Sequence, residues 1–91
     1  MSEPALEIYG PPRFAPGTCV RAARAVRNDG TLAGAARGDW IVSAGELGYV
    51  RDVGIFLQRF YVYAVEFVDR GAIVGMRADE LVLERTVEDQ L

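Results

Sequence analysis

The stretch that decides the fold is Tyr61-Val62-Tyr63-Ala64-Val65-Glu66-Phe67-Val68. Its alternate positions, beginning with Tyr61, are all aromatic or β-branched, whereas the positions between them are mixed. Successive side chains of a β-strand point to opposite faces of the sheet, and aromatic and β-branched residues are enriched in strands. The stretch therefore predicts a strand with one face on the core and the other face only partly covered.

Turn signals separate further strands on both sides of this one. Asp69-Arg70-Gly71 predicts a hairpin turn, and residues 78–81 predict one helical turn before the last strand. Gly54 is expected to end the strand that precedes the central one. About five short strands with glycine turns between them predict a small all-β barrel or sandwich. The expected strands are Trp40–Val42 and residues 47–53, 61–68, 72–77 and 82–84.

One segment and the two chain ends are less regular. Residues 18–27 fit either a helix, because arginines recur at every third position, or a strand, because apolar residues alternate. Gly10-Pro11-Pro12 cannot lie inside regular structure, so residues 1–12 are expected to form a flexible tail. We therefore expect a domain over residues 13–85, followed by a frayed C-terminus at 86–91.

The composition excludes several classes of protein. The chain has 91 residues, a formal charge of −3, no histidine and one cysteine. Without histidine it has no imidazole base, and with one thiol it can neither form an internal disulfide nor hold an iron–sulfur cluster, which needs about four thiolates. The acidic balance argues against nucleic-acid binding. We expect no catalytic, cofactor or metal site, and Cys19 is either a small buried apolar residue or a thiol activated by nearby Arg21.

No segment predicts contact with a membrane. The longest apolar run, residues 60–65, is far shorter than the roughly 20 residues that span a bilayer. The N-terminal residues lack the basic and apolar regions of a signal peptide. Together with the single cysteine, these features predict a cytoplasmic protein.

The segment Gly54-Ile55-Phe56-Leu57-Gln58 places three large apolar side chains in an expected loop between strands. Phe56 or Leu57 could close one end of a barrel. The alternative is an exposed apolar contact site for a partner protein, since such patches mark interfaces. The residues alone leave both interpretations open.

Several separated motifs, in order, resemble the NifZ family of nitrogen-fixation accessory proteins. They cover the chain from about Arg13 to Val82, so the resemblance is specific. The motifs are Arg27-Asn28-Asp29-Gly30-Thr31, Gly34, residues 48–54, Phe56-Leu57-Gln58, the alternating Tyr63, Val65 and Phe67, Val74-Gly75-Met76-Arg77, and Glu80-Leu81.

The resemblance implies an SH3-type β-barrel, which favours the strand over the helix for residues 18–27. It also implies a non-enzymatic, chaperone-like maturation factor that binds the immature nitrogenase molybdenum–iron protein and assists formation of its P-clusters. Other nitrogenase assembly factors are further expected partners. The chain is short beside family members that carry C-terminal extensions.

The contact surface is expected in loops, whereas Tyr49, Tyr63, Val65 and Phe67 are expected in the core. Two other functions stay open: a non-catalytic barrel subunit of a larger enzyme complex, and a nucleic-acid-binding barrel with Tyr49, Phe60 and Tyr61 as stacking platforms. The expected partner-binding residues are Asn28, Asp29, Gly30, Thr31, Arg51, Asp52, Phe56, Leu57 and Gln58.

Overall fold

The computed structural model describes residues 6–27 and 40–91, and within these ranges the regular structure is almost entirely β. Short 3-10 helices accompany the strands, and the described residues contain no α-helix. The all-β class is confirmed. The elements are η1 (Glu7–Tyr9), β1 (Cys19–Ala22), β2 (Val26–Arg27), β3 (Trp40–Val42), β4 (Leu47–Phe56), β5 (Phe60–Phe67), β6 (Ala72–Met76), η2 (Ala78–Glu80), β7 (Leu81–Arg85) and η3 (Glu88–Gln90).

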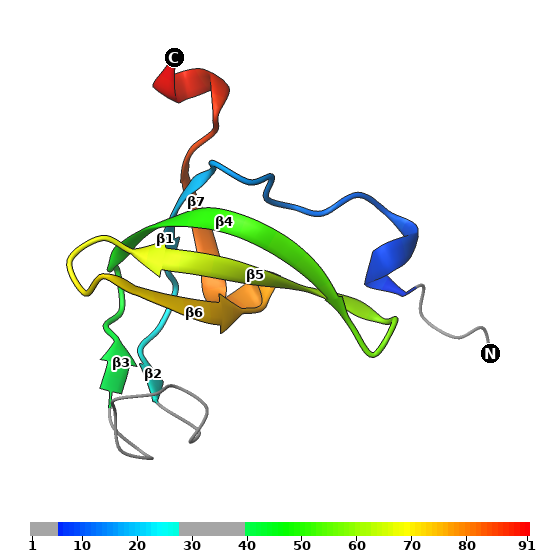
Figure 1. Ribbon diagram of the computed structural model, residues 1–91, viewed down its shortest axis with the longest axis horizontal. Helices are drawn as coiled ribbons and strands as arrows, with labels where there is room; N and C mark the ends of the chain where they lie inside the picture. Colours follow the sequence, from blue (N-terminus) through cyan, green and yellow to red (C-terminus); the bar gives the residue numbers. More distant parts are fainter. Residues whose placement is uncertain (1–5, 28–39) are drawn as a thin grey trace.

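The strands form two antiparallel sheets. The larger has five strands in the order β6-β5-β4-β1-β7, and β2 and β3 make a second sheet of two strands (Figure 1). Within the described ranges, β6 and β7 are the open edges of the larger sheet. The all-β expectation therefore holds, whereas closure of the sheet into a barrel stays a prediction.

The central strand lies as its sequence pattern predicts. Burial alternates strictly along β5, with Tyr61, Tyr63, Val65 and Phe67 buried and the residues between them partly exposed. Residues of β1, β3, β4, β6 and β7 complete the core on the same side of the sheet. We call this side the core face and the opposite side the outer face.

Residues 18–27 contain the strands β1 and β2 and no helix, as the family resemblance implied. β1 lies between β4 and β7 and pairs with both of them. Its backbone hydrogen bonds are therefore made on both sides, which a strand permits and a helix at this place would not. Pairing with neighbours outweighs the weak helical preference of the alanines and arginines.

The structure corrects two expectations about β4. The strand does not end at Gly54 but continues to Phe56, because residues 52–56 stay paired with β5. Tyr49 is not a core residue. It lies half-buried on the outer face, while its neighbours Gly48 and Val50 face the core. Gly48 approaches β5 so closely that a Cβ there would lie 2.6 Å from Val65 Cγ1.

The segment before β1 runs along the sheet (Figure 1). Ile8 packs against the core, and the backbone N–H of Arg13 donates a hydrogen bond of 2.8 Å to the Tyr63 hydroxyl. Of the expected flexible tail, residues 1–5 lie outside the described residues. The mobility expected for residues 1–12, the domain bounds 13–85 and the frayed end at 86–91 stay predictions.

Candidate partner-binding site

The turn between β4 and β5 projects three large apolar side chains into solvent. Ile55, Phe56 and Leu57 are 60%, 53% and 67% exposed. Figure 1 shows this turn at the end of the long β4–β5 hairpin, away from the turn that joins β5 to β6. We call residues 55–58 the hairpin tip. Because Phe56 and Leu57 are exposed, the interpretation that either of them closes one end of a barrel is wrong.

The backbone of the hairpin tip is unusual. Leu57 and Gln58 have φ angles of 54° and 53°, and they are the only described residues other than glycine with positive φ. The N–H of Arg59 donates to the Phe56 carbonyl oxygen at 3.1 Å, closing a four-residue turn. Positive φ at both central residues is the pattern of a type I′ turn, which normally selects Asn and Gly. Leu57 and Gln58 occupy it at a cost in backbone free energy.

Two further expected site residues, Arg51 and Asp52, lie away from the hairpin tip. Arg51 and Asp52 lie within β4 and not in a loop, at the point where the strand register shifts. Arg51 pairs with Glu66 at 2.6 Å, and its guanidinium carbon lies 5.6 Å from the centre of the Tyr49 ring. The Asp52 carboxylate accepts a hydrogen bond from the next backbone N–H. Asn28, Asp29, Gly30 and Thr31 lie outside the described residues.

Two residues that the sequence reasoning did not assign to the site lie beside Phe56. The Phe56 and Phe60 rings are 5.4 Å apart between centres and inclined at 50°. The guanidinium carbon of Arg77 lies 3.5 Å from the centre of the Phe60 ring. The strand register places Phe60 opposite Phe56, so alternation along β5 could have put both on one face. No local signal points to Arg77.

Cys19 is fully buried, which supports the structural interpretation of this residue over a reactive thiol. Its sulfur atom lies on the outer side of β1, 3.9 Å from Nη2 of Arg85. Among the described residues, no group of three or more Cys, Asp or Glu side chains is placed to hold a metal ion. The same part of the chain contains no helix long and apolar enough to cross a membrane.

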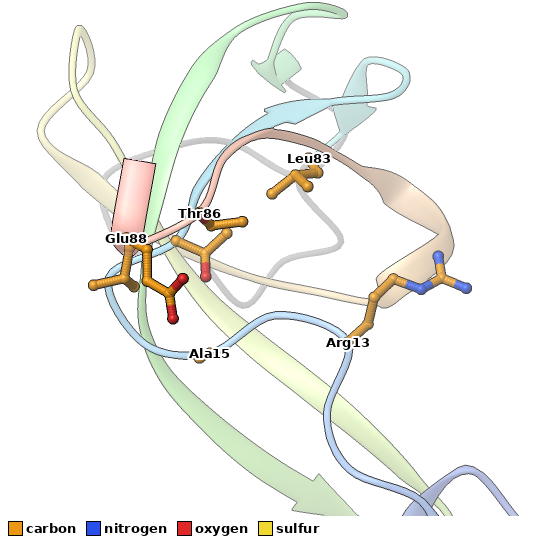
Figure 2. Close-up of a pocket in the computed structure, with 7 residues that line it drawn as sticks. Arg13, Ala15, Leu83, Thr86 and Glu88 are labelled. Carbon is orange, nitrogen blue, oxygen red and sulfur yellow. The ribbon is translucent and has the colours of Figure 1, made fainter. Parts of the chain in front are cut away.

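A shallow pocket of about 330 Å³ lies between the segment before β1 and the C-terminal turn. Figure 2 shows Arg13 and Glu88 at opposite sides of it, with Leu83 and Thr86 between them. Every buried side-chain nitrogen and oxygen of the described residues has a hydrogen-bond partner. No buried polar group without a partner therefore marks this pocket as a ligand site.

The sequence model of the NifZ domain matches residues 11–83. The chain belongs to the NifZ family. It is 56% identical over 79 residues to a NifZ protein of Sinorhizobium fredii (strain NBRC 101917 / NGR234), covering 87% of this chain and 73% of that protein. It is 52% identical over 71 residues to a NifZ protein of Rhodobacter capsulatus, covering 78% of this chain and 91% of that one.

The NifZ protein of Klebsiella pneumoniae is 45% identical over 71 residues, which are 78% of this chain but 48% of the Klebsiella protein. The chain thus spans about half the length of that NifZ relative. No solved structure matches the chain. Membership of the NifZ family associates the protein with nitrogen fixation, and the apolar hairpin tip lies within the matched region.

Proposed function

We propose that the protein is a nitrogenase maturation factor. In this proposal it binds an immature form of the molybdenum–iron protein in the cytoplasm, assists formation of the P-clusters in the manner of a chaperone, and catalyses no reaction itself. The exposed apolar hairpin tip carries the proposal. A NifZ-family protein that holds Ile55, Phe56 and Leu57 in solvent has a surface suited to a protein partner.

The thiol content favours such a binding role over a cluster scaffold. Stable iron–sulfur clusters are held by about four cysteine thiolates, and this chain has one cysteine, which is buried. A chaperone of cluster formation does not need to ligate the metal. It can bind a surface that the client exposes only before maturation and so shift the client toward that conformation.

A capture experiment tests the proposal. Tagged protein is mixed with molybdenum–iron protein from cells with complete P-cluster maturation or with blocked maturation. We expect selective capture of the immature form. Equal capture of both forms would support the alternative of a permanent subunit, and capture of neither would overturn the proposal. Retention of the protein on heparin at moderate salt would instead support nucleic-acid binding.

Variants connect the capture to the hairpin tip. Phe56→Ala with Leu57→Ala removes exposed side chains, so we expect weaker capture with only a small loss of stability. Val82→Ala with Leu83→Ala is the matched control, because these two side chains are half-exposed on the edge strand β7. Equal capture by both double variants would show that the hairpin tip is not the contact site.

A further inference from the structure

The hairpin tip continues into an aromatic and cationic cluster on the outer face. Phe60 alternates with the buried residues of β5 and so lies on the outer face, with Phe56 opposite it on β4. Arg77 follows β6 directly and places its guanidinium over the Phe60 ring at 3.5 Å. We call Phe56, Phe60 and Arg77 the aromatic–arginine cluster. Aromatic residues and arginine are enriched at protein interfaces relative to the rest of the surface.

Among the described residues, no carboxylate forms an ion pair with the Arg77 guanidinium, which distinguishes it from three arginines of the strands and turns. Arg21, Arg51 and Arg70 are bound to Glu84, Glu66 and Glu46, respectively. Glu80 binds Arg77 through the backbone. Its carboxylate accepts a hydrogen bond of 2.8 Å from the Arg77 backbone N–H and not from the guanidinium. In a chain of net charge −3, this cation is left available.

The contact with Phe60 also determines which part of the Arg77 guanidinium a partner can reach. The ring covers one side of the group, with the guanidinium carbon 3.5 Å from its centre, while Arg77 as a whole is exposed to solvent. An arginine held in this way is suited to bind a carboxylate through two parallel hydrogen bonds. The partly exposed rings beside it are suited to an apolar side chain.

Gly54 leaves open space next to the cluster. It lies on β4 two residues before Phe56, on the same face, and pairs with Val62 of β5. A Cβ built at Gly54 would meet no other atom within 4 Å. A side chain of a partner can therefore approach the sheet at this point without displacing any part of the protein.

We propose that the aromatic–arginine cluster is a docking site for a protein segment that presents a carboxylate next to a large apolar side chain. The carboxylate binds the Arg77 guanidinium, and the apolar side chain packs on Phe56 and Phe60 above Gly54. This docking site specifies how the proposed maturation factor recognises its client. The inference depends on the proposed function only for the identity of the partner.

The first test uses two synthetic peptides and does not need the client. We titrate isotope-labelled protein with acetyl-Gly-Phe-Glu-Leu-Gly-amide or with the same peptide carrying Gln in place of Glu, and follow NMR shifts. The Arg77 Nε–H signal and the amides of residues 54–60 should shift saturably with the Glu peptide. The Gln peptide should bind about tenfold more weakly, because it lacks the charged acceptor. Equal affinity for both peptides would overturn the inference.

Three variants and one control sharpen this test. Arg77→Met removes the cation, and Arg77→Lys keeps the charge but loses the planar donor pair. Gly54→Thr fills the open space with a residue that favours strands, so it should keep the fold and block the site. Arg24→Met removes an exposed arginine outside the strands and is the control. We expect the amide shifts to be lost in Arg77→Met and Gly54→Thr, weakened in Arg77→Lys and kept in the control.

The capture experiment then separates the two proposals. If wild-type protein captures the immature client and Arg77→Met and Gly54→Thr capture it equally well, the docking site is wrong and the proposed function stands. If the peptide response is as expected but no form of the client is captured, the proposed function is wrong and the docking site stands.

Discussion

The Tyr61 hydroxyl donates a hydrogen bond of 2.7 Å to the carbonyl oxygen of Gly10, across 51 residues of chain. The backbone N–H of the same tyrosine donates to the Glu7 carboxylate at 2.6 Å. Both bonds are partly buried. A single residue of β5 therefore holds the segment around η1 against the sheet.

Replacing Tyr61 by Phe removes the bond to Gly10 and keeps the buried ring. We expect the free energy of unfolding to fall by about 1 kcal/mol, the usual net value of one such bond. Amide exchange in residues 7–10 should accelerate more than exchange in β4 or β5. Denaturant unfolding and hydrogen exchange measure the two effects, and equal acceleration throughout the sheet would contradict local anchoring.

Substitution by alanine should have opposite effects on the free energy of unfolding at two glycines of β4. A Cβ at Gly48 would lie 2.6 Å from Val65 Cγ1 and 3.1 Å from the Glu66 carbonyl oxygen, so Gly48→Ala should destabilise by about 1–3 kcal/mol. A Cβ at Gly54 meets nothing within 4 Å, and Gly54→Ala should stabilise by about 0.4–1 kcal/mol. Urea denaturation of both variants checks this. Equal losses would show that the register of β4 and β5 differs from the one described.

The turn at the hairpin tip can be made more stable. Leu57→Asn with Gln58→Gly supplies the residues that positive φ prefers, so the free energy of unfolding should rise by about 1 kcal/mol. The same variant removes the exposed Leu57 side chain, so client capture should weaken although the fold is more stable. Gln58→Val, which is strained at positive φ, should lower the midpoint of thermal unfolding. A rise with Gln58→Val would exclude the type I′ turn.

The Glu84 carboxylate should make part of the free energy of unfolding depend on pH in the acid range. A hydrogen bond from Arg21, at 2.8 Å, together with the charge of that guanidinium, holds the pKa of Glu84 below its usual value against the opposing effect of desolvation. A carboxyl whose pKa is lowered in the folded state stabilises above its unfolded pKa of about 4.3, and this effect is lost as the pH falls through the folded pKa.

Glu84→Gln should therefore unfold at lower urea concentration than the wild type at about pH 7, and the difference should shrink as the pH falls below about 4.3, the unfolded pKa. Because the pair is exposed, about 1 M salt should also reduce the difference. A difference that stays constant from neutral to acid pH would show that the pair does not act through charge.

The fold was largely predictable where one face of a strand is buried. Period-two alternation located β5, and turn residues located the β5–β6 hairpin, because both signals are local. The end of β4 was not predictable from Gly54, since pairing with β5 carries the strand past a residue that weakens strands. Tyr49 was misplaced because hydrophobicity alone does not tell which face of a strand turns inward.

The candidate site was predictable only in part. The apolar run at Phe56 and Leu57 pointed to the hairpin tip, and exposure then decided between a buried plug and a contact surface. Arg77 could not be found in this way, because its place over Phe60 depends on how β6 pairs with β5. Contacts that depend on strand register require the three-dimensional arrangement.

The position of β1 in the sheet has a consequence for synthesis on the ribosome. β4, β5 and β6 are joined by short turns and can pair as soon as residue 76 has left the exit tunnel. β1 can then join β4, but its other side pairs with β7, so that Cys19 lies opposite Arg85, 66 residues later. Until residues 81–85 emerge, the nascent chain carries an unpaired strand edge, the kind of surface that invites association with other chains. Among the described strands, β7 follows the others in sequence, and it is the one that covers this edge.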